Sequence, residues 1–78
     1  MHFSLENLGR AIASRRHQCG FTQAQLAIKA GLNRTYLSDV EQGHRNVTLD
    51  VLTKICSTLG VNMSDLLSHA EQSQRREL

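Results

Sequence analysis

The sequence predicts an all-α fold, a compact domain of five helices. Apolar residues recur at intervals of three and four along most of the chain, which is the period of a helix with one buried face. Proline is absent, so glycine is the only strong helix breaker. No segment alternates apolar and polar residues as a strand does. Because 78 residues hold one modest core, we expect a single domain over residues 1–70 and a frayed or disordered tail at 71–78.

The first expected helix begins after Ser4, whose side chain can cap it, and runs to about His17 before Gly20 ends it. Glu6 lies in its first turn, where a carboxylate suits the helix dipole. Its apolar stripe is formed by Leu5, Leu8, Ala11 and Ile12.

Two short helices follow, each with a recognisable start and stop. A T-x-x-Q capping box from Thr22 to Gln25 opens the second helix, and Gly31 stops it. Asn33 can cap a third helix that closes at Gly43.

A polar linker leads into the last two expected helices. The fourth begins after Thr48 and ends at Gly60, and the fifth opens at Asn62, with Asp65 three residues later in a capping arrangement. The apolar period is lost after about Ala70, which is why we expect the tail to fray. The buried sides are formed by Leu49, Leu52, Ile55, Cys56 and Leu59, and by Met63, Leu66 and Leu67.

The second and third expected helices carry the spacing of a helix-turn-helix. Counted from Gln23, Ala27 is fifth, where two helices cross closest, and Gly31 is ninth, where the turn needs a residue that adopts positive φ easily. A generic helical hairpin would also need apolar stripes and a glycine, but it gives no reason for a third helix that is short, polar and capped. The inward positions four, ten, fifteen and eighteen are Leu26, Leu32, Leu37 and Val40.

Composition argues against several other classes of protein. Nine Lys and Arg against seven Asp and Glu give a formal charge of +2, which is compatible with nucleic acid without indicating it. Cys19 and Cys56 match no metal-ligand or redox spacing, so we expect reduced thiols in the cytoplasm. The histidines lack the i, i+4 pairing of a helical metal site, and no nucleophile motif is present. We therefore expect no enzyme, no metal and no cofactor.

No apolar run approaches the roughly 18 residues of a membrane helix, so no membrane partner is expected. No ligand-binding domain is evident, so we expect no small-molecule ligand either.

Three segments, FTQAQLAIKAGL, YLSDVEQG and LGVNMSDLL, resemble the lambda-repressor-like helix-turn-helix regulators, often called the XRE or Cro/C1 family. The resemblance covers roughly Leu5 to Leu67. Within the family, NRTYLSDVEQGHRNVTLDVL is most similar to the controller proteins of restriction-modification operons, which are small dimeric regulators with RTY at the start of the recognition helix. The resemblance implies a lambda-repressor-like fold and a transcriptional regulator that binds double-stranded DNA.

In that fold the N-terminal half of the third helix enters the major groove. With Leu37 pointing inward and 100° per residue, the candidates for base contacts are Arg34, Thr35, Ser38 and Asp39. The Arg34 guanidinium matches O6 and N7 of guanine. Asp39 could accept from cytosine N4, orient a neighbouring side chain, or point aside.

Phosphate contacts are expected from helix N-termini and flanking polar groups. Tyr36 leaves two alternatives open, a hydroxyl that reaches a phosphate or an ordinary half-buried core residue. The full set of phosphate candidates is Thr22, Gln23, Tyr36, Gln42, His44, Arg45 and Asn46.

In similar repressors an arginine late in the first helix pairs with the glutamate of an E-x-G segment. The resemblance therefore implies a structural bridge between Arg16 and Glu41, in addition to the structural roles of Ala27 and Gly31 in the turn.

One short helix reads only about four or five base pairs, and each specific contact contributes about 1 to 3 kcal/mol. We therefore expect a homodimer on a palindromic operator, with recognition helices about 34 Å apart. RNA polymerase is a further candidate partner. The alternative function is an antitoxin or another protein-interaction module on the same scaffold. The apolar residues of helices four and five either form part of a dimer interface or belong wholly to the core: Val51, Leu52, Ile55, Leu59, Val61, Met63, Leu66 and Leu67.

Overall fold

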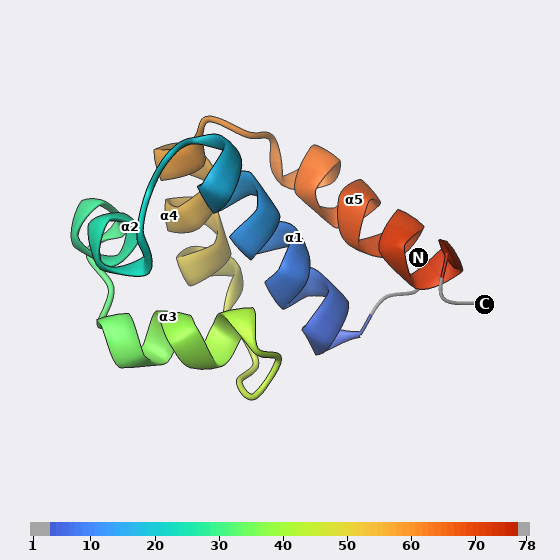
Figure 1. The fold of residues 1–78 in the computed structure, drawn as a ribbon, viewed down its shortest axis with the longest axis horizontal. Coiled ribbons are helices and arrows are strands. Elements are labelled where there is room, and N and C mark those ends of the chain that lie inside the picture. The colour runs from blue at the N-terminus through green and yellow to red at the C-terminus, as the bar shows by residue number, and fades with distance from the viewer. Residues whose placement is uncertain (1–3, 77–78) are drawn as a thin grey trace.

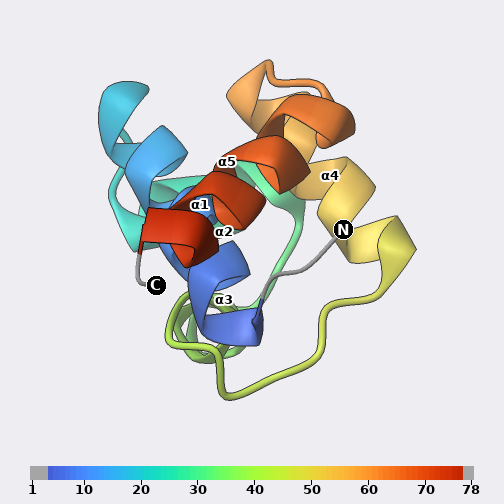
Figure 2. The same cartoon turned by 90° about the vertical axis from the view of Figure 1, so that its right-hand side faces the viewer.

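The computed structural model describes the backbone of residues 4–76 and the side chains of residues 4–72. The predicted all-α fold is confirmed: helix α1 runs through the middle of the molecule, α5 packs along one side of it, and α3 packs against the other (Figure 1). Helix α2 packs on α3 and α4. Helix α4 lies beside α5, as the turned view in Figure 2 shows. The bounds are α1 Leu5–Gln18, α2 Gln23–Ala30, α3 Arg34–Glu41, α4 Leu49–Leu59 and α5 Met63–Arg76.

The predicted caps of the first four helices are confirmed. In each case the side-chain oxygen of the capping residue accepts from the backbone N–H three positions later, which satisfies a donor that the helix start leaves unpaired. At the start of α2 the box is reciprocal, because the Gln25 side chain also accepts from the Thr22 N–H at 2.9 Å. The four capping residues are Ser4, Thr22, Asn33 and Thr48.

The turn between α2 and α3 depends on Gly31. Its φ is 71°, and the following Leu32 N–H donates to the Ala27 carbonyl at 2.7 Å, which redirects the chain into α3. A Cβ at Gly31 would meet no atom within 4 Å. The backbone angle, and not lack of space, is therefore what favours glycine here.

The core lies between the five helices and is almost entirely aliphatic. Of the inward positions of the helix-turn-helix, Leu26, Leu37 and Val40 are buried as predicted, and Leu32 is partly buried against the same cluster. The buried apolar residues are Leu8, Ala11, Ile12, Leu26, Ala27, Ala30, Leu37, Val40, Leu52, Ile55, Cys56, Leu59, Leu66 and Ala70.

Two residues expected on buried stripes are exposed instead. Leu5 is 37% exposed and Leu49 is 70% exposed. Each is the first residue of its helix. Helical side chains lean toward the N-terminus, so a residue at the first position projects past the packed part of the helix.

Helix α5 continues to Arg76, beyond Ala70, where the apolar period of the sequence ends. The segment after Ala70 contains no glycine or proline and is rich in Glu, Gln and Arg, which favour helix without needing an apolar partner. Loss of the apolar period therefore marks the end of the buried face and not the end of the helix. Residues 77–78 of the expected tail lie outside the described residues.

Within residues 4–76, no helix is long and apolar enough to cross a membrane. Both cysteines are free thiols, Cys19 exposed and Cys56 buried. Burial raises the pKa of the Cys56 thiol above its ordinary value, so this side chain stays protonated at neutral pH and packs as a small apolar group.

Candidate nucleic-acid interface

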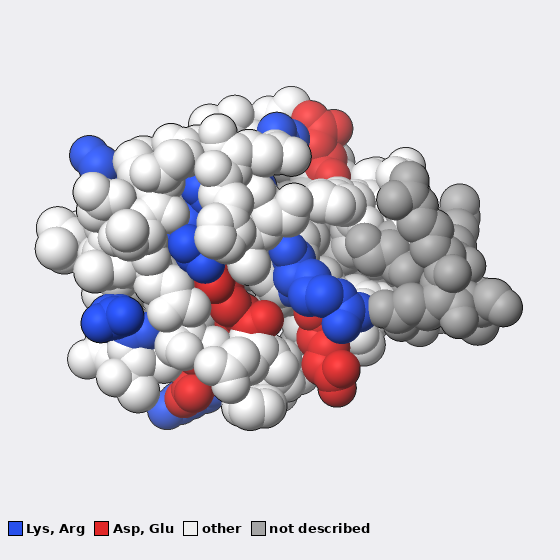
Figure 3. Space-filling model, in the orientation of Figure 1, with Lys and Arg blue, Asp and Glu red and all other residues white. Residues whose placement is uncertain are grey.

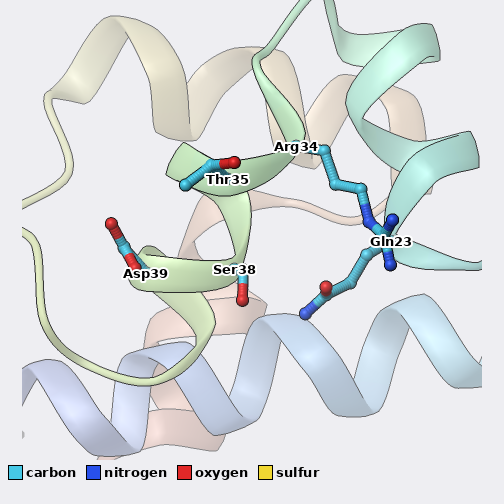
Figure 4. A pocket seen from close by; sticks show the side chains of 5 residues that line it. All are labelled: Gln23, Arg34, Thr35, Ser38 and Asp39. Carbon is cyan, nitrogen blue, oxygen red and sulfur yellow. The ribbon is translucent and has the colours of Figure 1, made fainter.

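The start of α2 and the outer face of α3 form a shallow hollow of about 240 Å³. All four predicted base-contact residues line it, together with Gln23 at the start of α2 (Figure 4). Arg34 extends from the first turn of α3 toward Gln23, whereas Asp39 points to the other side of the helix. The lining residues are Gln23, Arg34, Thr35, Ser38 and Asp39.

Helix α3 separates its buried and outward faces as the helical period predicts. Leu37 and Val40 are 0% and 2% exposed, while Arg34 and Thr35 are exposed. No hydrogen bond or ion pair engages Arg34 in the part of the chain that the structure describes. Its five N–H donors are therefore available to an external acceptor.

The bridge between Arg16 and Glu41, implied by the resemblance, is present and buried. Arg16 Nε donates to Glu41 Oε2 at 2.8 Å and Nη2 donates to Oε1 at 2.9 Å. The side chains are only 9% and 5% exposed. Arg16 Nη1 also donates to the Phe21 carbonyl at 3.0 Å, so one guanidinium ties the end of α1 to α3 and to the chain entering α2.

Gln23 extends this network to the surface, a link that the sequence did not indicate. Its Nε2 donates to Glu41 Oε1 at 3.0 Å. A carboxylate can only accept, so this contact fixes which end of the amide faces the bridge. A residue predicted to contact phosphate is thus held in place by the structural pair.

Gly9 is a second feature that the helix-turn-helix pattern did not indicate. A Cβ at this position would lie 2.4 Å from the Glu41 carbonyl oxygen and 2.5 Å from that of Val40. The last turn of α3 can therefore lie directly against α1 only because residue 9 has no side chain. A glycine inside a helical pattern was the available signal.

A second cluster lies on the other edge of α3. The guanidinium of Arg45 lies over the ring of Tyr36, 5.3 Å from its centroid, and Arg45 Nε is 3.9 Å from Asp39 Oδ2. Tyr36 is half-buried and packs against the core. Arg45, a predicted phosphate candidate, therefore lies next to both another phosphate candidate, Tyr36, and a base candidate, Asp39.

The remaining phosphate candidates lie at the two ends of the helix-turn-helix. Thr22 accepts from the Gln25 N–H at 3.1 Å, and its own hydroxyl hydrogen can still be donated. Gln42 Nε2 donates to Ser38 Oγ at 3.1 Å. His44 and Asn46 are exposed in the segment after α3.

The charges do not form one continuous basic patch on the face seen in Figure 3, where acidic side chains lie near several of the basic ones. Among the described residues, no group of three His, Cys, Asp or Glu side chains could hold a metal ion. The candidate interface is therefore marked by a few cationic and amide side chains beside the N-termini of α2 and α3, and not by a broad basic patch.

Comparison with known proteins agrees with this geometry. The model of the Helix-turn-helix family matches residues 12–66. The chain is 47% identical over 53 residues to the control protein C.BamHI of Bacillus amyloliquefaciens, covering 68% of this chain and 65% of that protein. It is 40% identical over 58 residues to the control protein C.MunI of a Mycoplasma species, covering 74% of this chain and 78% of that protein.

Solved structures are similar over nearly the whole chain. The wild-type restriction-modification controller protein C.Esp1396I superposes with a TM-score of 0.85 at 30% identity, covering 97% of this chain and 99% of that one. The clp gene regulator ClgR from Corynebacterium glutamicum superposes with a TM-score of 0.91 at 33% identity, covering 94% of this chain and 78% of that one.

Proposed function

Because the chain belongs to the lambda-repressor-like (XRE) helix-turn-helix family of DNA-binding regulators, we propose that it is a controller protein of the restriction-modification type. In this proposal it binds palindromic operator DNA as a homodimer in the cytoplasm and changes the access of RNA polymerase to a promoter. Similarity to control proteins over most of the chain supports the assignment.

The observation that carries the proposal is the outward face of α3 beside the start of α2. An unengaged arginine at the first turn of a short, capped helix suits a major groove, whose width admits one helix. Arg34, Thr35 and Ser38 are proposed to meet base edges. Arg34 is the strongest candidate, because a guanidinium pairs with guanine in a bidentate geometry.

The proposed phosphate contacts flank this reading face. Thr22 and Gln23 lie at the N-terminus of α2, where the helix dipole and unpaired N–H groups favour an anion. Tyr36, Gln42, His44, Arg45 and Asn46 lie on or just after α3. Arg45 carries a full positive charge and is the strongest of them.

The homodimer is proposed to form through α4, α5 and the turn between them. Four of the apolar residues considered for the interface are buried in the core: Leu52, Ile55, Leu59 and Leu66. The other four are only partly buried, so part of their apolar surface is open to a symmetric partner. These four, Val51, Val61, Met63 and Leu67, are called the dimer patch below.

Binding to random-sequence duplex across a salt series tests whether DNA is the partner. Each phosphate that the protein neutralises should contribute a slope of about −0.9 in log affinity against log salt. Several contacts should therefore make affinity fall steeply, whereas a slope near zero would remove DNA as the ligand. Lys54→Ala, which removes a charge paired with Asp50 on α4, is the control and should leave the slope unchanged.

A further inference from the structure

The chain folds back after α3 so that Arg45 lies across the edge of the recognition helix. Tyr36 and Asp39 are three residues apart on α3 and therefore lie on the same side of it. Gly43 has a φ of 78°, and the His44 N–H donates to the Asp39 carbonyl at 2.9 Å, which together return the chain toward α3.

The contact between Asp39 and Arg45 is oriented. Arg45 Nε lies 3.9 Å from Asp39 Oδ2, and Arg45 Cζ lies over the ring of Tyr36, 5.3 Å from its centroid. The side chains of Arg45 and Asp39 are 58% and 37% exposed. Exposed ion pairs contribute little to folding, so this contact adds little to the stability of the domain.

We propose that Asp39 is a positioning residue, which orients the guanidinium of Arg45 toward DNA and does not itself read a base. The proposal rests on the DNA-binding function proposed above. With Nε turned toward Asp39, the two terminal nitrogens of Arg45 and their four N–H groups are left for a pair of acceptors. On DNA such a pair is either two phosphate oxygens or O6 and N7 of guanine.

The charge of Asp39 supports this role over a direct base contact. A lone carboxylate beside DNA repels the phosphates, whereas Asp39 and Arg45 together carry no net charge. Asp39 lines the same hollow as Arg34, but its side chain points away from Arg34 in Figure 4, and it belongs to the C-terminal half of α3, whereas base contacts in this fold are concentrated in the N-terminal half.

A double-mutant cycle tests the proposal. Affinity for the selected operator and for random duplex is measured for wild type, Asp39→Asn, Arg45→Ala and the double variant. Residues that act through one another show coupling, so Asp39→Asn should weaken operator binding roughly fivefold and change nothing further once Arg45 is alanine. Asp39→Glu, which keeps a carboxylate within reach of Arg45, should restore most of the loss.

Two results would overturn the positioning role. If Asp39→Asn tightens operator and random duplex equally, Asp39 only repels phosphate. If its loss persists in the Arg45→Ala background, Asp39 contacts a base directly. Asp50→Asn removes a paired carboxylate on α4, whose side chain is 80% exposed, and should leave both affinities unchanged. Circular dichroism of each variant verifies that it is folded.

Arg45→Ala in a base-by-base competition identifies the acceptors. Relaxed preference at one base pair per half-site would indicate guanine, and a uniform loss with a salt slope smaller by about one would indicate phosphate. Both results fit a positioned arginine. An Arg45→Ala variant with unchanged base preference and unchanged affinity would contradict the proposal. A wild-type protein without salt-dependent DNA binding would instead overturn the proposed function itself.

Discussion

Arg34 is the residue through which we expect the recognition helix to select sequence most directly. It is exposed in the first turn of α3, and no partner among the described residues competes for its donors. We expect Arg34→Ala to cost about 1 to 3 kcal/mol at the preferred operator and to relax preference at one base pair per half-site. Competition with operators substituted at each position measures this.

A loss of affinity that is equal for every sequence would instead place Arg34 on the DNA backbone. Arg15→Ala is the matched control, because Arg15 lies on α1 and contacts Gln18 at 3.2 Å. It should leave base preference unchanged.

Glu41 is predicted to matter for folding more than for base preference. Removing it strands the Arg16 guanidinium, which is 9% exposed, without its carboxylate partner. The loss of one partner from a buried pair costs about 3 to 5 kcal/mol. Glu41→Ala should therefore lower the free energy of unfolding by about that amount, as measured by urea denaturation.

An unchanged melting temperature for Glu41→Ala would refute the structural role of the bridge. Asp50→Ala provides the comparison, because it breaks an exposed i, i+4 pair with Lys54 and should cost no more than about 0.5 kcal/mol.

At the scale of helices, the crossing of α1 and α3 depends on Gly9. Alanine is the better helix former by about 1 kcal/mol, so propensity alone predicts that Gly9→Ala stabilises α1. Its Cβ would, however, lie 2.4 Å from a backbone oxygen of α3, which cannot turn aside as a side chain would. We expect net destabilisation of about 1 to 3 kcal/mol, as for other overpacked contacts.

Thermal unfolding measures this, and a melting temperature for Gly9→Ala that equals or exceeds the wild-type value would show that the helices have room to separate. Ser14→Ala on the same helix is half-buried and should stay within about 0.5 kcal/mol.

The helices and their caps could be predicted because both depend on local sequence. Ser4, Thr22, Asn33 and Thr48 each bond to a backbone group three residues away, so a short window contains the whole interaction. The end of the last helix could not be predicted, because the apolar period indicates burial and not helix formation. Helix α5 continues to Arg76 without that period.

The candidate site was predictable in part. The outward residues of α3 followed from the helical period once Leu37 was placed inward. The hydrogen bond from Gln23 to Glu41 joins residues 18 positions apart, and Arg45 reaches Asp39 only through the path of an irregular segment. Such contacts depend on packing and loop geometry, which local patterns do not encode.

At the scale of the whole molecule, the dimer patch should determine assembly. Met63 and Leu67 lie one turn apart on α5 and are only partly buried. We expect the wild type to sediment as a dimer at micromolar concentration. Leu67→Glu should sediment as a folded monomer with weakened operator binding, because a buried interface disfavours an unpaired charge.

Ile28→Glu is the control for this prediction. It introduces the same charge at an apolar residue that is 80% exposed on α2, outside the dimer patch, and should leave the dimer intact. A wild-type protein that remains a strict monomer at micromolar concentration would contradict the proposed assembly.

In the proposed complex two copies of α3 read one duplex, and selection of bound sequences from a random DNA library tests this most directly. We predict that the selected sites contain two inverted half-sites about one helical turn apart, with centres separated by roughly 10 base pairs. No enriched sequence, or a single half-site without its inverted repeat, would contradict the account.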